Sequence, residues 1–161
     1  MLEELASTFP ILSCILFLPV IGGVVLWLFD DEDMVRTSAL TIALLELALS
    51  VFVLLRFIPE SAAMQFSEHV PWIPALGVSY HLAVDGISVL FVGLTAFLSV
   101  LVIIYSWDTV RHQVKLYMMA LLALETTTMG VFLSLDLILF FVFWELMLIP
   151  SYFMIKLWGG G

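Results

Sequence analysis

Five long apolar runs constrain the fold of this chain more than any other feature. A bilayer core about 30 Å thick is crossed by a helix of about 20 apolar residues. Five segments reach that length, at approximately residues 9–29, 38–58, 87–105, 116–133 and 137–157. Charged residues make up 12% of the 161 residues, against about 25% in soluble domains. We therefore expect an all-α fold, a polytopic membrane helical bundle of about five transmembrane helices, forming a single membrane domain over residues 1–161.

The segments that connect the five spans differ in character. Residues 30–36 (DDEDMVR) predict a solvated acidic loop, and residues 59–86 predict a long non-helical stretch rich in Pro, His and Trp. Residues 134–136 form so short a link that the fourth and fifth helices are expected to be antiparallel neighbours. Three glycines directly after the fifth span end the sequence, and we expect the chain to be a fragment of a larger subunit.

Basic residues are distributed unevenly over the two ends of these helices. With the N-terminus outside, four of the five Lys and Arg residues lie on the inner side, namely Arg36, Arg111, Lys115 and Lys156. Tryptophans fall at the same inner ends, as in an interfacial aromatic belt: Trp27, Trp107 and Trp158. Because basic residues favour the inner side of a membrane, the sequence predicts an outside N-terminus.

Composition argues against several kinds of function. The chain has no basic patch that could neutralise phosphates, so no nucleic acid is expected as a partner. The sequence has a single cysteine, and it contains neither a His/Cys cluster at metal-ligand spacing nor a Gly-rich phosphate loop. We therefore expect no metal and no other cofactor in this chain.

Three acidic residues lie inside the apolar runs: Glu46, Glu125 and Glu145. A charge at bilayer depth costs from about 2.5 to above 10 kcal/mol, so such an acid is a functional candidate. Glu145 is expected about 12 to 15 Å deep in the fifth span. Pro150 has no backbone N–H and loosens the helix just beyond this acid. A carboxyl in apolar surroundings without a cation spends part of its time protonated, as a proton relay requires.

Glu125 is expected at the same depth as Glu145, because Leu135 in the tight turn is ten residues from each of them. If the two acids face each other, they form a pair with coupled protonation; their spacing leaves this open. The alternative is that each acid stays neutral and hydrogen-bonds a neighbouring helix. For Glu46, nearer the inner end of the second span, a functional and a structural role remain equally open.

Two further acids sit just before predicted helices. Asp85 in VDGIS and Asp136 in LDL occupy positions where a side chain accepts hydrogen bonds from the first backbone N–H groups. We predict capping, rather than proton transfer, for both.

Three stretches carry a resemblance to a known family: FFVFWELMLIPSYFMIKLWGG (140–160), VDGISVLFVGLTAFLSVLVIIYSW (84–107) and GVFLSLDLILF (130–140). They closely resemble the antiporter-like membrane-arm subunits of respiratory complex I, the proton-pumping NADH:quinone oxidoreductase, with the chain M type nearest. The resemblance implies that Glu145 is the key glutamate of a first proton half-channel and that Glu125 is the glutamate of the preceding helix. It also implies the N-terminal part of an antiporter-like fold with inverted repeats, with the lysine partner of Glu145 outside this chain.

The resemblance implies a function for the intact subunit. It would contribute part of a proton-translocating half-channel coupled to electron transfer from NADH to quinone, as one subunit of an enzyme whose NADH and quinone sites lie in other subunits. Its partners would be other membrane-arm subunits and the lipid bilayer, in the bacterial cell inner membrane or an equivalent energy-transducing membrane. The alternatives are a subunit of a multi-subunit Na+/H+ antiporter or membrane-bound hydrogenase, and an inactive truncated product.

Overall fold

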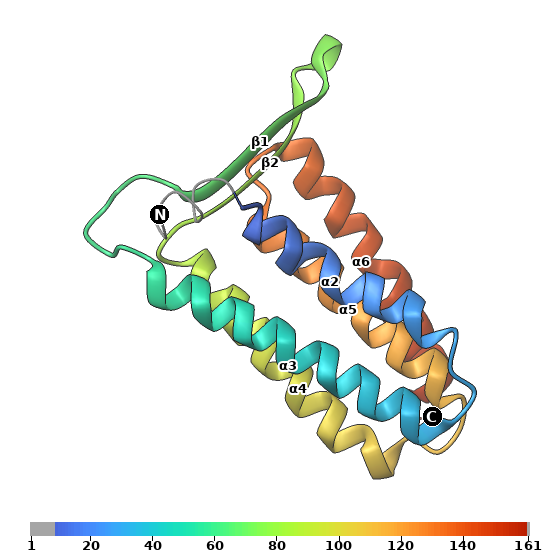
Figure 1. Cartoon of the computed structure of the whole chain (residues 1–161). Helices are drawn as coiled ribbons and strands as arrows, with labels where there is room; N and C mark the ends of the chain where they lie inside the picture. Colours follow the sequence, from blue (N-terminus) through green and yellow to red (C-terminus); the bar gives the residue numbers. More distant parts are fainter. Residues whose placement is uncertain (1–8, 161) are drawn as a thin grey trace.

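In a computed structural model, which describes residues 9–160, these residues fold into five α-helices and one β-hairpin (Figure 1). The helices are α2 (Ile11–Leu26), α3 (Glu32–Arg56), α4 (Ser88–Thr109), α5 (Val114–Leu133) and α6 (Leu137–Trp158). The hairpin pairs β1 (Gln65–Ile73) with β2 (Val78–Val84) in antiparallel register.

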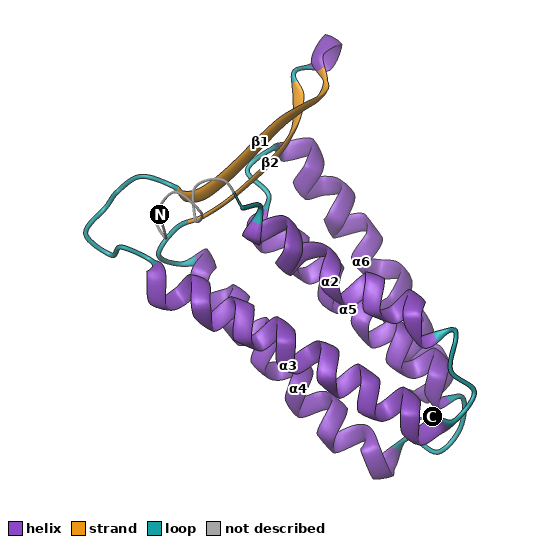
Figure 2. Ribbon diagram, in the orientation of Figure 1, coloured by secondary structure: helices purple, strands orange, loops and turns teal. Residues whose placement is uncertain are grey.

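The five helices run side by side, and successive helices are antiparallel (Figure 1). On one side α5 packs against α2 and α6, and on the other side α3 packs against α4. Helix α5 also contacts α3 and α4, so it lies at the centre of the bundle, whereas α6 is packed mainly on α5. Figure 2 shows the hairpin at one end of the bundle, projecting beyond the helices. We call this end the hairpin end.

Each predicted span corresponds to one helix. Helices α3, α4, α5 and α6 are long and apolar enough to cross a membrane, and α2 is apolar but has 16 residues. Helix α2 is shorter than the predicted span of residues 9–29 because a turn beginning at Trp27 leads directly into α3.

The prediction of a loop over residues 30–36 is wrong for most of that segment. Helix α3 begins at Glu32, and the side chain of Asp31 caps it by accepting a hydrogen bond from the backbone N–H of Asp33 at 3.4 Å. Glu32 and Asp33 occupy the first turn, where acidic side chains interact favourably with the helix dipole. The acidic run therefore starts a helix.

The stretch predicted to be non-helical contains the β-hairpin, which the all-α prediction did not include. His69 and His81 lie opposite each other across the two strands, with their ring centroids 4.8 Å apart. Gly77 follows the tip of the hairpin with φ = 67°, a conformation that glycine adopts without steric cost.

The interior of the bundle contains two apolar clusters at different heights. The cluster near the hairpin end consists of Ile11, Leu12, Ile15, Leu16, Val53, Leu82, Val84, Val89, Val92, Ala96, Met129, Leu133, Leu139 and Phe143. The cluster near the opposite end consists of Leu26, Val35, Ala39, Ala43, Val100, Ile103, Val110, Val114, Tyr117, Met118, Leu121 and Leu122. Buried polar side chains lie at the heights between them, as described below.

The hairpin is attached to α2 by a carboxylate. Pro10 precedes α2 and has no side chain that could cap it. Instead, the carboxylate of Glu68 in β1 accepts hydrogen bonds from the backbone N–H groups of Leu12 at 2.8 Å and Ser13 at 3.1 Å, and another from the Ser13 hydroxyl. The free N–H groups at a helix start favour an anion, so Glu68 both caps α2 and holds the hairpin to it.

The end opposite the hairpin carries four basic residues, and we call it the basic end. Lys115 pairs with Asp30 at 3.3 Å. Arg36 donates a hydrogen bond to the carbonyl of Val110 at 3.2 Å, joining the start of α3 to the α4–α5 loop. Arg111 lies in that loop and Lys156 in the last turn of α6. The prediction that these basic residues share one end of the bundle is confirmed.

Candidate functional site

Glu145 lies on the outer face of α6 and is exposed. Residues one helical turn away on the same face are also exposed and apolar, including Phe141 at 59%, Leu148 at 54% and Ile149 at 55% relative exposure. Glu145 has no hydrogen bond or ion pair with the other residues that the structure describes. The carboxyl therefore faces away from this bundle, in the middle of an apolar helix surface.

The rotation of α6 that exposes Glu145 is fixed by packing on its opposite face. There the Phe143 ring lies against Gly130 of α5, so closely that a Cβ atom at residue 130 would be 2.3 Å from the ring. At the basic end, the Trp158 indole N–H donates a hydrogen bond to the carbonyl of His112 at 3.0 Å. At the hairpin end, the Asp136 carboxylate accepts one from the backbone N–H of Ser79 at 3.0 Å.

Glu125 occupies the opposite environment. Its side chain is 2% exposed and lies in the interior, where α5 meets α2, α3 and α4. Neither carboxyl oxygen has a hydrogen-bond partner among the described residues. The Ser99 hydroxyl of α4 is near enough to interact with this carboxyl, although no hydrogen bond of ordinary geometry joins them.

Glu125 and Glu145 are at the same height but are not brought together. Glu125 is eight residues before the end of α5 at Leu133, and Glu145 is eight residues after the start of α6 at Leu137. Glu125 nevertheless points into the bundle, whereas Glu145 points out of it. The arrangement in which these two acids face each other, which the sequence left open, is absent from the described residues.

Three threonines follow Glu125, and each already has a hydrogen-bond partner. Thr126 accepts a hydrogen bond from the backbone N–H of Val20 in α2 at 3.0 Å. The hydroxyls of Thr127 and Thr128 both donate to the carbonyl of Leu124, at 2.9 and 2.8 Å. The Thr128 hydroxyl also lies 3.6 Å from the Met147 sulfur of α6, so these hydroxyls join α5 to its neighbours.

Glu46, whose role the sequence left open, is the acid that lies near Glu125. Its side chain is completely buried in α3 and has no hydrogen-bond partner among the described residues. Glu125 is close enough to act electrostatically on it. Ser50 and Ser99 are buried at similar heights and were missed by the sequence reasoning. The available signal was their position as isolated hydroxyls within apolar runs, level with the acids.

Asp85 and Asp136 cap helices, as predicted. Asp85 accepts hydrogen bonds from the backbone N–H groups of Ile87 and Ser88 at 2.9 and 2.7 Å, and these bonds lower the pKa of its carboxyl. Asp136 caps α6 by accepting from the N–H groups of Ile138 and Leu139. The further bond from Ser79, together with these, holds the pKa of Asp136 below its ordinary value.

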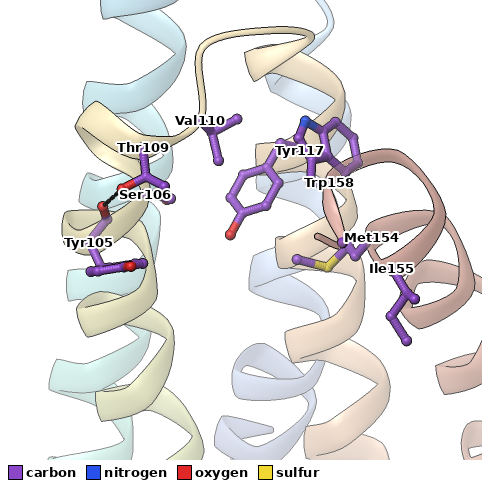
Figure 3. Close-up of a pocket in the computed structure, with 9 residues that line it drawn as sticks. Tyr105, Ser106, Thr109, Val110, Tyr117, Met154, Ile155 and Trp158 are labelled. Carbon is purple, nitrogen blue, oxygen red and sulfur yellow. Dashed lines mark hydrogen bonds between the residues drawn. The ribbon is translucent and has the colours of Figure 1, made fainter. Parts of the chain in front are cut away.

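A pocket of about 320 Å³ opens at the basic end between α4, α5 and α6 (Figure 3). Figure 3 shows the Tyr117 ring of α5 directed into the space between α4 and α6, beside the Trp158 indole. The lining residues are Tyr105, Ser106, Thr109, Val110, Tyr117, Met154, Ile155, Trp158 and Gly159. These residues include no acid or base, so the pocket does not belong to the carboxyl sites.

Within residues 9–160, no group of three or more His, Cys, Asp or Glu side chains is placed so that it could hold a metal ion. The arrangement presents carboxyl groups in apolar surroundings, which are groups that can exchange protons.

Comparisons with known proteins agree with the membrane fold. No protein-family model matches the chain. The chain is 41% identical over 155 residues to NAD(P)H-quinone oxidoreductase chain 4 2 of Thermosynechococcus vestitus, which covers 94% of this chain and 29% of the relative. It is 37% identical over 158 residues to NADH-quinone oxidoreductase subunit M of Rickettsia conorii, which covers 94% and 32%. The chain thus spans about a third of the length of these curated relatives.

Solved structures give the same picture. A chain of respiratory complex I from Thermus thermophilus with bound NADH superposes with a TM-score of 0.77 at 27% identity, covering 93% of this chain and 30% of that one. A chain of the Mrp complex from Dietzia sp. DQ12-45-1b has a TM-score of 0.75 at 22% identity, covering 92% and 16%, and shows the shared fold alone. Together with the identity to subunit M and chain 4 proteins, these matches show that nearly the whole chain is similar to a part of NADH-quinone oxidoreductase subunits of this type.

Proposed function

We propose that this chain supplies Glu145, and with it part of a proton-translocating half-channel, to the membrane arm of a proton-pumping NADH:quinone oxidoreductase. One observation carries the proposal: Glu145 is exposed in the middle of α6, on an apolar face without a partner in residues 9–160. An acid at that depth is too costly to retain against lipid, so this face is covered by protein in the assembled complex.

The chemistry follows from the surroundings of Glu145. In an apolar environment without a cation, its carboxyl takes up a proton, and a cation brought close favours release of that proton. The cation comes from protein beyond the described residues, because the only basic residue of α6 is Lys156, eleven residues or about 16 Å further along the helix. Electron transfer elsewhere in the complex drives pumping by moving that cation or changing its charge.

The catalytic and binding roles are shared within the complex. NADH and quinone bind to other subunits, and this chain holds no cofactor. Its partners are the neighbouring parts of the membrane arm, which cover α6, and the lipid bilayer, which surrounds the remaining apolar surface. The chain thus acts as the proton-conducting part of an enzyme rather than as a redox centre.

The basic end faces the inside of the energy-transducing membrane, and the hairpin end faces outside, because four of the five basic residues lie at the basic end. Single cysteines test this orientation. In a Cys14→Ala background, we expect a membrane-impermeant maleimide added from outside to label Ser61→Cys beside the hairpin and to leave Asp108→Cys unlabelled. Labelling of Asp108→Cys alone would reverse the orientation.

The variant Glu145→Gln tests the proton-transfer role in the intact complex, measured in sealed membrane vesicles. The amide keeps the size of the side chain and loses its titratable proton, so proton transfer through this route is expected to fall on the order of a hundredfold. The measurement is the rate of NADH-driven proton uptake divided by the rate of NADH oxidation.

Glu60→Gln is the matched control, since Glu60 is an exposed acid in the loop before β1. We expect it to pump protons like the unmodified complex. A Glu145→Gln complex with the same proton uptake per NADH as this control would contradict the proposal.

A further inference from the structure

A polar layer crosses the interior of the bundle between the two apolar clusters. It consists of Glu46 and Ser50 of α3, Ser99 of α4, and Glu125 of α5, which are between 0% and 7% exposed. In each helix the residues on either side belong to the clusters: Ala43 and Val53 in α3, Ala96 and Val100 in α4, and Leu122 and Met129 in α5. Apolar side chains therefore separate this layer from both ends of the bundle.

The two carboxyl groups of the layer are unpartnered. Both oxygens of Glu46 and both oxygens of Glu125 lack a hydrogen-bond partner among the described residues, as does the Ser50 hydroxyl. Buried polar atoms in proteins are almost always hydrogen-bonded, so four unpartnered carboxyl oxygens in one layer require a reason. A bound proton removes the charge of a carboxyl and so lowers the cost of burying it, although it does not supply the missing hydrogen-bond partners.

Among the described residues, no positive charge pairs with Glu46 or Glu125. The three ion pairs of residues 9–160 lie at the basic end and involve Arg36 and Lys115. From α2 the titratable group close enough to act on Glu46 is the Cys14 thiol, and α4 contributes the uncharged Ser99. An isolated buried carboxylate is strongly disfavoured, and two adjacent ones would also repel each other.

We propose that Glu46 and Glu125 form a second proton-binding site, separate from Glu145, in which the two carboxyl groups titrate as a coupled pair and retain a proton at neutral pH. After one carboxyl releases its proton, the negative charge left on it raises the cost of ionising the other carboxyl, which therefore keeps its own proton. The site uses α3, α4 and α5, whereas Glu145 lies on the far side of α6. It goes beyond the proposed function, because the pair binds protons whether or not Glu145 conducts them.

Infrared spectroscopy of the full chain in lipid bilayers tests the pair. A protonated carboxylic acid has a carbonyl stretching band that a carboxylate lacks. At neutral pH we expect the wild-type chain to show this band, and Glu46→Gln and Glu125→Gln each to reduce it or shift it. Because the acids are coupled, the pH midpoint of the remaining band is expected to differ from that of the wild type by about one pH unit or more in each single variant.

Two controls locate the effect. Glu60→Gln changes an exposed acid and is expected to leave the band unchanged. Glu145→Gln is expected to remove any contribution of its own without moving the midpoint of the pair, because Glu145 faces the other way. If a glutamine variant in the layer fails to fold, Ser99→Ala provides the test, since loss of the neighbouring hydroxyl shifts the carbonyl frequency of a protonated Glu125.

Three results would overturn the proposal: no protonated-acid band at neutral pH in the wild type, equal midpoints in the wild type and both single variants, or a midpoint that moves with Glu145→Gln as much as with Glu46→Gln. None of these depends on pumping, so failure of this site and failure of the Glu145 half-channel are distinguishable.

Discussion

Glu125 and Glu145 are the same residue type at the same height on adjacent helices, yet one is enclosed and the other open. In α5, 56% of the most apolar stretch is buried within the chain, and in α6 only 17%. Glu125 is therefore surrounded by α2, α3 and α4, whereas Glu145 faces outward. The difference shows that helix rotation and neighbours, rather than depth, decide the surroundings of a membrane carboxyl.

The two environments also differ in what each acid can exchange protons with. An enclosed carboxyl is limited to groups of its own bundle, and here the nearby acid is Glu46. An open carboxyl on α6 meets whatever protein covers that face. In the two proposals above, the enclosed acids Glu46 and Glu125 (the closed side) store a proton, and Glu145 on the outer face of α6 (the open side) passes one on.

Apolar replacement of the two acids gives the largest expected contrast in stability. Replacing buried ionisable groups by well-packed apolar residues of similar volume is often neutral or stabilises a protein by about 1–4 kcal/mol, and Glu125 has no compensating partner among the described residues. We therefore expect Glu125→Met to raise the thermal unfolding midpoint of the chain in detergent, and Glu145→Met to change its stability by no more than about 0.5 kcal/mol. Equal shifts in the two variants would remove the distinction between a closed and an open side.

Substitution of Gly130 tests the contact between α5, which carries the enclosed Glu125, and α6, which carries the open Glu145. Gly130→Ala places a Cβ against the Phe143 ring that seats α6 on α5, and such overpacking costs about 1–3 kcal/mol. Gly93→Ala is the matched control, because nothing lies within 4 Å of a Cβ at that position of α4; there the substitution is expected to stabilise the helix by up to about 1 kcal/mol. Thermal unfolding compares the two variants, and opposite signs are expected.

Substitution of Glu68 measures how much its carboxylate contributes to the attachment of the hairpin to α2. Glu68→Gln weakens the acceptor that caps α2, and the loss of such a cap typically costs about 1 kcal/mol of folding free energy. We expect a lower unfolding midpoint and faster amide exchange at Leu12 and Ser13. Exchange at these amides that matches the Glu60→Gln control would show that the carboxylate charge contributes nothing to this cap.

The smallest effect is expected at Asp136, whose carboxylate joins the start of α6 to the hairpin. Hydrogen bonds from Ser79, Leu139 and Ile138 lower the pKa of its carboxyl below the ordinary value of 3.8. The contribution of this carboxylate to stability is therefore fully present above pH 3.8 and is lost as the pH falls through the lowered pKa. In the unmodified chain, we expect the amide exchange rate at Ser79, corrected for its intrinsic pH dependence, to rise only in that acid range. In Asp136→Asn, which has no titratable group at this position, we expect no such rise.

The helices of this fold could be predicted from the sequence more completely than the contacts between them. The tight turn at residues 134–136 and the Asp136 cap follow from local patterns, and the structure confirms both. The faces of the helices did not follow, because a helix that is apolar all round has no polar side to indicate which face is inward. The inward rotation of Glu46 and the outward rotation of Glu145 are set by packing contacts such as that of Gly130 with Phe143.

Long-range polar contacts were likewise beyond the sequence. Glu68 caps a helix whose first turn is more than fifty residues earlier in the chain, and nothing in SEHVPW marks it as a capping residue. The acidic run at residues 30–33 was misjudged for the opposite reason: its charges suit solvent, and they suit the first turn of a helix equally well.

The hairpin has one further consequence, which is mechanical. Glu68 of β1 holds the first turn of α2, and the Ser79 N–H of β2 donates a hydrogen bond to Asp136 at the start of α6. The hairpin thus joins two helices that do not follow each other in the sequence. A shift in the position of the hairpin would therefore act on the starts of both helices at once.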